Sequence, residues 1–566
     1  MNDPQLSAGV RSRFSRSAGT VTTTRKSRSD PYRELGLVLL ASAILTVALT
    51  FPMAFKIGRV GRVDKGDGQL SIWNVAWVAR ALVVDPLHVF DANIFYPHRA
   101  TLAYSENNLG AGAMAIPVYW ATRNPYAAHN FAMLVAFVLS AAGMYYLVRH
   151  LTGDRRAAAV SAIGFAFCPF VFAHTAHIQL LMTAGLPFTL LAFHRMADRP
   201  GAARGATLGA AMAGQAICCG YYGVFACLMV GFAITVVATT RRLWTDRGFW
   251  TAIAIGALVA VLLVGPAFLP YVTLQQVGGF RRELKDAVQY SANWSDYLAS
   301  SAYAHAWMLA YLPPWTEVSF PGFVIVVFGA CGAWVAARHR REIAFLYGGL
   351  TLLAFWASFG PSGQLYSALY KVVPMFAWLR APARFGVIVG FGLSVLAGVA
   401  VAEWLRRARR PALVTGALVI AAVAELAVPI YMPDVPAVDP VYRTLVTLPR
   451  GPVIEMPFFY PQVGLFQHTK YMLASTAHWM PLVNGYSDYI PPDFYEHVML
   501  LAAFPSRDAF KILEPNAVRY AVFHMNGYNT ENRNDVLGRL KEFEPYLRPL
   551  YADAATRLYE IVRYPP

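Results

Sequence analysis

The amino-acid sequence predicts a multi-pass α-helical membrane protein with a small α/β domain at its C-terminus. The 566 residues are 57% hydrophobic and only 14% charged, and their mean hydropathy is +0.41. Soluble chains are about 45–50% apolar and about 25% charged. The apolar residues also form separate blocks between 35 and 430, whereas residues 431–566 have the composition of a soluble domain.

The first 34 residues are rich in Ser, Thr and Arg and contain no apolar run, with seven basic residues against three acids. The first apolar run lies too far from the N-terminus, and is too long, for a cleaved signal peptide. We therefore expect a disordered cytoplasmic arm over 1–34 that leads into a signal-anchor helix at about 35–54.

Eleven apolar segments are candidate membrane spans, since a span needs about 20 apolar residues. The run 206–239 is too long for one helix, and we divide it at Cys219–Gly223, where two glycines permit a turn. The eleven segments are 35–54, 127–148, 157–173, 179–194, 206–220, 221–239, 250–271, 322–337, 343–359, 385–404 and 412–430.

Arginine-rich loops predict the orientation. Five short loops hold 16 arginines against four acids: 149–156, 195–205, 240–249, 338–342 and 405–411. Basic loops face the cytoplasm, so the net charge of +16 reports topology rather than a nucleic-acid surface. An odd number of spans with a cytoplasmic N-terminus leaves loops 55–126, 272–321 and 360–384 and the domain 431–566 outside. We expect the membrane to be the cell (inner) membrane.

The exterior segments carry further structure. Segments 71–84 and 362–379 carry aromatic residues that suit interfacial helices. Segment 109–122 is too short to span and contains Pro117, so it suits a re-entrant or interfacial helix. In the C-terminal domain we expect strands at 452–456, 519–524 and 556–562, and helices at 440–448, 493–504 and 534–543.

The sharpest local feature is Asp67, which stands between Gly66 and Gly68 shortly after the first span. Glycines let the backbone bend and let a ligand approach closely, and a carboxylate near the outer membrane surface can act as a general base. The alternative is an ordinary Asp-Gly turn, which is common loop chemistry.

Other exterior polar residues could bind substrate. Glu106 could be a second acid or a ligand for a divalent cation, Mg²⁺ or Mn²⁺, or it could merely cap the helix after it. His174 and His177 share a face if their segment is helical; they could bind a phosphate or a metal, or only bond to headgroups and backbone.

Exterior arginines suit phosphate, which guanidinium groups bind bidentately. Arg380 and Arg384 stand just before the span at 385, where a topology signal would avoid arginine. The alternative for each is an interfacial contact with lipid headgroups. Further exterior cations are Arg281, Arg282 and Lys285, and Glu317 could pair with one of them.

Several functions lose support because their motifs are absent. The sequence has no P-loop for ATP-driven transport and no Gly-x-Ser-x-Gly elbow. Ionisable residues are scarce within the predicted spans, which disfavours an ion-coupled transporter.

The pattern resembles the GT-C class of integral membrane glycosyltransferases, in particular bacterial members predicted to use polyprenyl-phosphate sugars. The resemblance lies in the spans, the large first exterior loop with an early Asp, and the exterior C-terminal domain. Three further stretches are similar to bacterial members: Gly66-Asp67-Gly68 through Trp77 and Phe95-Tyr96-Pro97, Pro374–Phe385, and His478-Trp479 with Asn484–Ser487.

The resemblance implies transfer of a sugar from a polyprenyl-phosphate carrier to an exterior envelope glycan, lipid or protein, with inversion. It implies that Asp67 is the general base and that Arg380 or Arg384 stabilises the departing phosphate. Asp64 or Glu106 would be the second acid if a metal is used. The alternative is a non-enzymatic flippase for lipid-linked glycans or an assembly factor for envelope polysaccharide.

Overall fold

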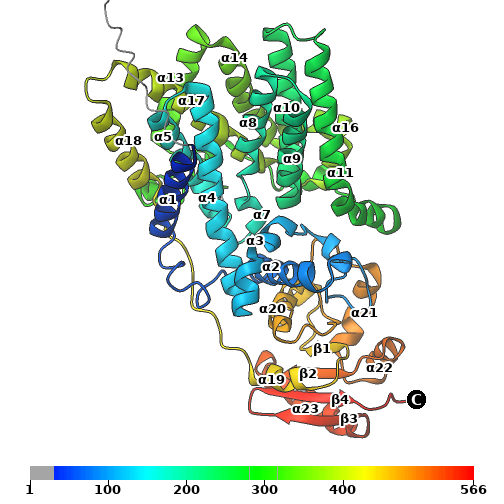
Figure 1. The fold of residues 1–566 in the computed structure, drawn as a ribbon. Coiled ribbons are helices and arrows are strands. Elements are labelled where there is room, and N and C mark those ends of the chain that lie inside the picture. Colours follow the sequence, from blue (N-terminus) through cyan, green and yellow to red (C-terminus); the bar gives the residue numbers. More distant parts are fainter. Residues whose placement is uncertain (1–30, 280, 315–316) are drawn as a thin grey trace, which may run out of the picture.

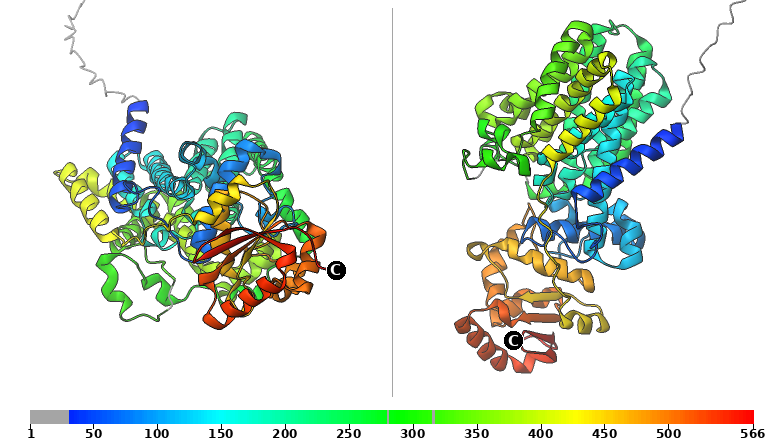
Figure 2. Two further views of the ribbon diagram at one scale, coloured as in Figure 1. Left: turned by 90° about the horizontal axis from the view of Figure 1, so that it is seen from below. Right: turned by 90° about the vertical axis from the view of Figure 1, so that its left-hand side faces the viewer.

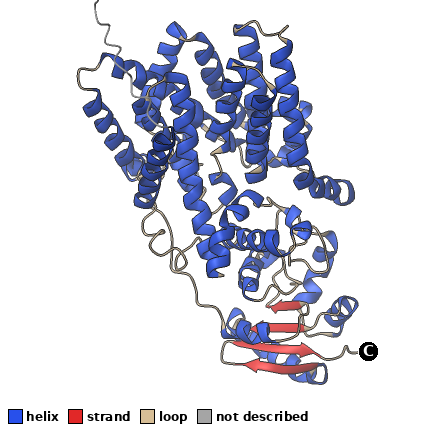
Figure 3. Ribbon diagram, in the orientation of Figure 1, coloured by secondary structure: helices blue, strands red, loops and turns tan. Residues whose placement is uncertain are grey.

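The computed structural model describes residues 31–279, 281–314 and 317–566. It shows a bundle of long helices at one end, a layer of loops and short helices in the middle, and a small sheet at the other end (Figure 1). The secondary structure is mainly helical, and the strands are confined to the C-terminal region (Figure 3). Most of the expected disordered arm, residues 1–30, lies outside the described residues.

Each of the eleven predicted spans contains helix, and the chain is a membrane protein. Within the described residues, seven stretches are long and apolar enough to cross a membrane: α1 (Pro31–Leu49), α4 (Pro125–Thr152), α5 with α6 (Arg155–Ala173), α7 with α8 (Ile178–Asp198), α10 (Gly220–Thr240), α11 (Arg247–Gly278) and α17 (Gly386–Arg407). The other four predicted spans hold shorter helices: α9 (Ala202–Cys218), α13 (Phe323–His339), α14 with α15 (Arg341–Ile343 and Gly349–Ser358) and α18 (Pro411–Leu426). The count of eleven therefore stays a prediction.

The arginine-rich loops meet at one end of the bundle. Arg241 joins three of them, because it bonds Asp198 at 2.9 Å and Glu342 at 2.7 Å. Glu34, at the start of α1, accepts bonds from Arg149 and Arg155. Arg340 also donates to the Leu151 carbonyl, so four of the five loops share one side, as the topology requires. The assignment of that side to the cytoplasm stays a prediction.

The segment predicted as a surface helix at 71–84 is instead buried. It belongs to α2 (Asp67–Val84), whose Trp73 and Trp77 are 1% and 7% exposed. Their indole N–H groups donate to the Asn93 side chain and to the Val89 carbonyl. The interfacial prediction is wrong for this segment, since its aromatic side chains find polar partners within the protein rather than at lipid headgroups.

The other two segments expected at the interface are also helical. Helix α3 (Leu109–Thr122) packs against α2 and α4, and α16 (Leu365–Val372) is followed by a 3-10 turn at Pro374–Trp378. Figure 2 shows the middle layer, which includes α2 and α3, between the spanning helices and the C-terminal sheet.

The C-terminal region contains a four-stranded sheet in the order β1-β2-β4-β3. Strand β1 (Val453–Met456) is parallel to β2 (Tyr520–His524), and β4 (Thr556–Ile561) is antiparallel to β2 and to β3 (Leu547–Ala552). Three strands match the prediction. The missed strand β3 contains Pro549, which is tolerated because β3 lies at the sheet edge. The helices here are α19 (Pro440–Thr447), α20 (Thr469–Ala474), α21 (Pro492–Ala502), α22 (Arg507–Leu513) and α23 (Thr530–Glu542).

The C-terminal region packs tightly on the exterior loops. Asn93 donates to the Ser475 hydroxyl, the Tyr96 amide donates to the Leu482 carbonyl, and α20 lies against α2. Buried side chains from both regions form one continuous hydrophobic cluster. The expected domain limits at 34/35 and 430/431 therefore stay predictions, but the C-terminal residues plainly help to shape the exterior loops.

Candidate active site

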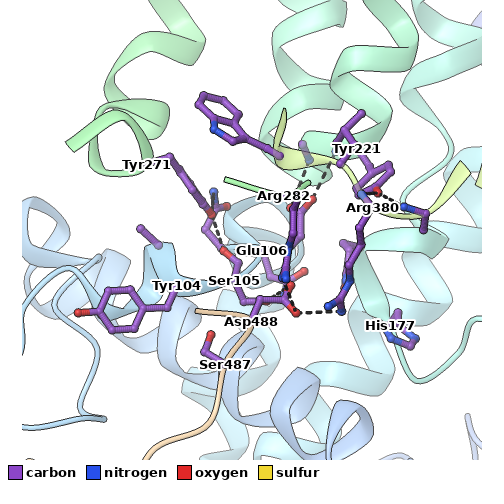
Figure 4. A pocket seen from close by; sticks show the side chains of 18 of the residues that line it. Tyr104, Ser105, Glu106, His177, Tyr221, Tyr271, Arg282, Arg380, Ser487 and Asp488 are labelled. Carbon is purple, nitrogen blue, oxygen red and sulfur yellow. Dashed lines mark hydrogen bonds and ion pairs between the residues drawn. The ribbon is translucent and has the colours of Figure 1, made fainter. Parts of the chain in front are cut away.

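A cavity of about 1160 Å³ lies where the spanning helices meet the middle layer of loops and short helices. Its polar end is built by the start of α2, the loop 103–108, the segment 378–384 and the C-terminal segment 486–488 (Figure 4). Its other walls carry apolar side chains of the spanning helices, among them Val224 of α10 and Val261, Val264 and Phe268 of α11. The cavity therefore offers a polar chamber and an apolar wall to the same ligand.

Asp67 is the first residue of α2 and lines the polar end of this cavity. Gly66 has φ +87°, and a Cβ on Gly68 would lie 2.3 Å from the Arg62 carbonyl oxygen, so both flanking glycines are needed. The Asp67 side chain is 53% exposed, and its Oδ2 lies 3.2 Å from His177 Nε2. Its bond to His177 and, more weakly, the charges of Arg380 and Arg384 lower the pKa of Asp67, which is thus ionised at neutral pH.

The two histidines would share a face only if their segment were helical, and it is not. Helix α6 (Pro169–Ala173) ends just before His174 and α7 (Ile178–Leu181) begins after His177, so the intervening residues form a turn. His177 reaches Asp67, whereas Nδ1 of His174 bonds the Phe170 carbonyl at 2.7 Å. Both line the cavity. Burial lowers the pKa of His174 to about 3, so this ring stays neutral.

Glu106 is also at the cavity, but it does not cap the helix that follows it. Its carboxylate accepts the amide N–H groups of Gly220 and Tyr221 at 3.2 and 3.3 Å, at the beginning of α10. It therefore caps a spanning helix that is distant in the sequence, and the local capping alternative is wrong. Burial raises the pKa of Glu106, although the two amide bonds oppose this shift.

Arg380 and Arg282 face one carboxylate from the C-terminal region. The Nη2 atoms of Arg380 and Arg282 lie 2.9 and 3.6 Å from Oδ1 of Asp488 (Figure 4). The Ser105 hydroxyl lies 3.5 Å from the other oxygen of Asp488. Asp488 follows the motif Asn484–Ser487 but was not among the residues singled out from the sequence. The sequence signal that could have identified Asp488 is an acid directly after that motif in a chain with arginines in its predicted exterior loops.

Arg384 lies over the Tyr221 ring at 4.4 Å, and Arg380 lies 5.1 Å from the Tyr290 ring. The Tyr221 hydroxyl accepts the amide N–H groups of Arg380 and Ala381, which fixes this segment against α10. Within the described parts of the chain, the Arg384 guanidinium has an aromatic contact but no ion-pair or hydrogen-bond partner. It is thus available to an anionic ligand.

Other candidates lie in different places. Asp64 is paired with Arg62 at 2.9 Å and does not line the cavity. Glu317 lines it, whereas Arg281 is exposed and lies over Tyr370. Lys285 is paired with Glu283 at 2.6 Å. Among the described residues, no group of three or more His, Cys, Asp or Glu side chains is arranged to hold a metal ion.

Comparisons with known proteins agree with this architecture. Residues 122–265, about a quarter of the chain, match the family model described as dolichyl-phosphate-mannose-protein mannosyltransferase. A search of curated protein sequences finds no match.

Among solved structures, the chain is similar to the arabinofuranosyltransferase AftD from Mycobacteria, with a TM-score of 0.57 and 15% identity, over 94% of this chain and 40% of that one. The chain thus spans well under half the length of that protein. ArnT from Cupriavidus metallidurans bound to undecaprenyl phosphate gives a TM-score of 0.46 at 14% identity, over 95% and 100% of the two chains. An oligosaccharyltransferase from Archaeoglobus fulgidus gives 0.46 at 13%, over 95% and 75%.

The fold assignment rests on the mycobacterial structure, which is matched over nearly all of this chain, together with the family-model match in the spanning region. The apolar helices and the large loops between them agree with it. The chain therefore has the GT-C fold of integral membrane glycosyltransferases.

Proposed function

We propose that this protein is a glycosyltransferase that moves a sugar from a polyprenyl-phosphate carrier to a hydroxyl acceptor on the exterior face of the membrane. The observation that carries this proposal is the cavity with a polar end beside Asp67 and an apolar wall on α10 and α11. A lipid-linked sugar has the same division into a charged, hydrated head and an apolar tail. The GT-C fold supports the proposal independently.

In this mechanism Asp67 is the general base. The acceptor hydroxyl gives its proton to the Asp67 carboxylate while its oxygen forms a bond to C1 of the donor sugar. The bond from C1 to the phosphate oxygen breaks, and its electron pair leaves with the phosphate. The attack comes from the face opposite the leaving group, so the sugar is inverted. His177 holds the carboxylate and keeps it ionised.

The arginines at the polar end stabilise the departing phosphate. Arg384 is the primary contact because its guanidinium is held by stacking on Tyr221 while its N–H groups stay free of carboxylates in the described chain. Arg380 is nearby but also bonds Asp488. Donors fixed near developing negative charge are among the larger contributions to catalysis.

Among the described residues, no three His, Cys, Asp or Glu side chains are grouped to hold a metal ion. Asp67 is paired with His177, and Glu106 accepts two backbone N–H groups. The Mg²⁺ or Mn²⁺ that the sequence left open stays a prediction, and no step of the mechanism uses a metal.

The proposal is tested with purified protein in proteoliposomes, using a labelled polyprenyl-phosphate sugar and envelope extract as acceptor. We expect Asp67→Asn to lower transfer by about 10²–10⁴-fold, the usual loss for a general base. Asp508→Asn, at an exposed position of the C-terminal region that does not line the cavity, is the matched control and should retain activity. Full transfer by Asp67→Asn would refute the base. Movement of the labelled lipid across the bilayer without any transfer would instead indicate a flippase.

A further inference from the structure

A second, smaller cavity lies at the far end of α2, away from Asp67. It has a volume of about 530 Å³, which is within the usual range for small-ligand sites. Its wall comes from the C-terminal half of α2, the exterior loop 85–99, and two residues of the C-terminal region, Arg450 and Pro481. Arg80 and Trp77 of α2 line one side of it.

This cavity is rich in arginine. Arg80, Arg99 and Arg450 line it, and the positive charge of Arg123 also acts on Arg80. Burial, together with the neighbouring charges of Arg450 and Arg123, lowers the pKa of Arg80. No carboxylate of the described chain contributes to that shift or forms an ion pair with Arg80. The fold therefore places the half-buried Arg80 beside the same cavity as the exposed Arg99 and Arg450, and like charges so placed are unfavourable unless something compensates for them.

The acids of this cavity are engaged elsewhere. Asp85 bonds the His88 ring at 3.0 Å, and Asp91 accepts the Ala100 amide at 2.8 Å. The remaining histidine, His98, bonds Asp493 at 3.0 Å. Neither Asp85 nor Asp91 forms an ion pair with an arginine of the cavity in the described chain.

Aromatic packing fixes the arginines in position. Trp479 adopts φ +53°, an uncommon conformation for a bulky residue, and its ring packs on Trp77 with centroids 5.6 Å apart. Arg80 lies over the same Trp479 ring at 5.6 Å, and Arg450 donates to the Trp479 carbonyl at 2.7 Å. The strained tryptophan thus holds guanidinium groups from two regions of the chain beside one cavity.

We infer that this cavity binds an oxyanion, a phosphate or carboxylate group, carried on a water-soluble chain. Arg80 and Arg450 are its principal contacts and Arg99 lies at its edge. Guanidinium groups recognise such oxyanions through paired N–H bonds.

A lipid headgroup is the less suitable source of the anion. None of the residues that line the cavity belongs to a helix long and apolar enough to span the membrane. Helix α2 lies between the spanning bundle and the C-terminal sheet (Figures 1 and 2), and its C-terminal half lines the cavity. A soluble anionic chain can reach this layer directly.

The position suggests which molecule uses the site, and this step rests on the proposed function. Asp67 and Arg80 are 13 residues apart on one helix, which corresponds to about 20 Å. An extended acceptor with anionic groups could bind at Arg80 while its end reaches the Asp67 cavity. The substrate class is then an anionic envelope glycan rather than a neutral one.

Calorimetric titration of the full-length protein in detergent tests the binding site itself. The probes are a hexamer of galacturonic acid, inorganic phosphate, a neutral glucose hexamer and nanodiscs that contain phosphatidylglycerol. We expect the uronic acid hexamer to bind, phosphate to compete with it, and the neutral hexamer not to bind. Arg450→Gln and Arg80→Gln should each weaken binding at least tenfold, the usual loss for a charged hydrogen bond.

Arg443→Gln is the matched control, because Arg443 is exposed in the same region but does not line the cavity. Arg450 is exposed, so its variant should fold even if the half-buried Arg80 variant does not. Equal binding of both hexamers, or no effect of Arg450→Gln, would overturn the inference. Arginine-dependent binding of the nanodiscs alone would assign the site to lipid and overturn it as well.

The same titration separates this inference from the proposed function. Asp67→Asn should bind the uronic acid hexamer as the unaltered protein does, since Asp67 lies in the other cavity. Binding without any transferase activity would keep the anion site and reject the enzyme. Transfer without anion binding would keep the enzyme and reject the site.

Discussion

The two ends of helix α2 lie in cavities of opposite design. At the Asp67 end, the cavity is large, includes walls from spanning helices, and pairs most of its charges: Asp67 with His177, and Arg380 with Asp488. At the Arg80 end, the cavity is smaller, has no wall from a spanning helix, and leaves Arg80 without a carboxylate partner among the described residues. Balanced charges suit a site that must handle both a proton and a phosphate. Unbalanced charges suit a site that only holds an anion.

Arg384 is the strongest test of this contrast after Asp67 itself, because its guanidinium has no ion-pair partner among the described residues. We expect Arg384→Ala to raise KM for the lipid-linked donor by about ten- to a hundredfold, the equivalent of one charged hydrogen bond. Initial rates across a donor titration in proteoliposomes measure the change.

The exposed Arg281 is the matched control, since it lies outside the cavity lining, and Arg281→Ala should leave KM unaltered. Arg384→Lys should recover part of the affinity by restoring the charge without the planar pair of donors. Unchanged donor kinetics in Arg384→Ala would remove the phosphate role from this residue.

His177 allows the pairing of Asp67 to be tested by pH. Because the bond to His177 is the largest cause of the lowered pKa of Asp67, the carboxylate should stay ionised below its ordinary pKa of about 3.9. The acid limb of kcat/KM should therefore lie below that value and move upward in His177→Gln. The two proteins should differ more at pH 4 than at pH 7.

His150→Gln is the control for this measurement, because His150 also pairs with an aspartate but at the opposite end of the bundle. Its acid limb should coincide with that of the unaltered protein. If His177→Gln lowers activity equally at every pH, His177 does not act through the ionisation of Asp67.

Replacing Asp488 should change KM for the donor less than replacing Arg384 does, and in the opposite direction. The carboxylate of Asp488 bonds Arg380 beside the proposed phosphate site, so the carboxylate and a bound phosphate should repel each other. In Asp488→Asn the amide can keep a hydrogen bond without the charge. We expect KM for the donor to fall about fivefold, the size of a partly exposed ion pair. A higher KM would mean that Asp488 mainly holds Arg380 in position.

Asp488 also illustrates how far the sequence could predict the structure. The spanning helices follow from long apolar runs, whose signal is local, and helix was found in every predicted segment. Asp67 could be singled out because its glycines are its immediate neighbours. The partners of these residues come from elsewhere in the chain: His177 reaches Asp67 from between α6 and α7, and Asp488 reaches Arg380 from the C-terminal region. Such pairs depend on packing, which no local pattern encodes.

The same reason explains the error in α2. Its aromatic residues at intervals of four are compatible both with a bilayer surface and with a protein interior. Two contacts from elsewhere in the chain stabilise the interior position: Asn93 accepts the Trp73 indole N–H, and the C-terminal Trp479 packs on Trp77.

Glu106 should give the smallest effect on activity, because its carboxylate caps α10 rather than facing the reacting groups. Glu106→Ala leaves the Gly220 and Tyr221 amides without this acceptor and should lower the free energy of unfolding by about 1–2 kcal/mol, the usual value of a helix cap. Thermal unfolding followed by scattering and fluorescence measures the loss, while transfer by the folded protein should change less than about threefold, or roughly 0.6 kcal/mol. Glu106→Gln, which keeps one acceptor oxygen, should be intermediate in stability. The same assay with EDTA and with added Mg²⁺ or Mn²⁺ tests the alternative role of Glu106 as a metal ligand. If Glu106→Ala abolishes transfer and shifts the metal dependence, Glu106 binds a metal ion. Asp67 would then have to be reinterpreted as a second ligand of the same ion.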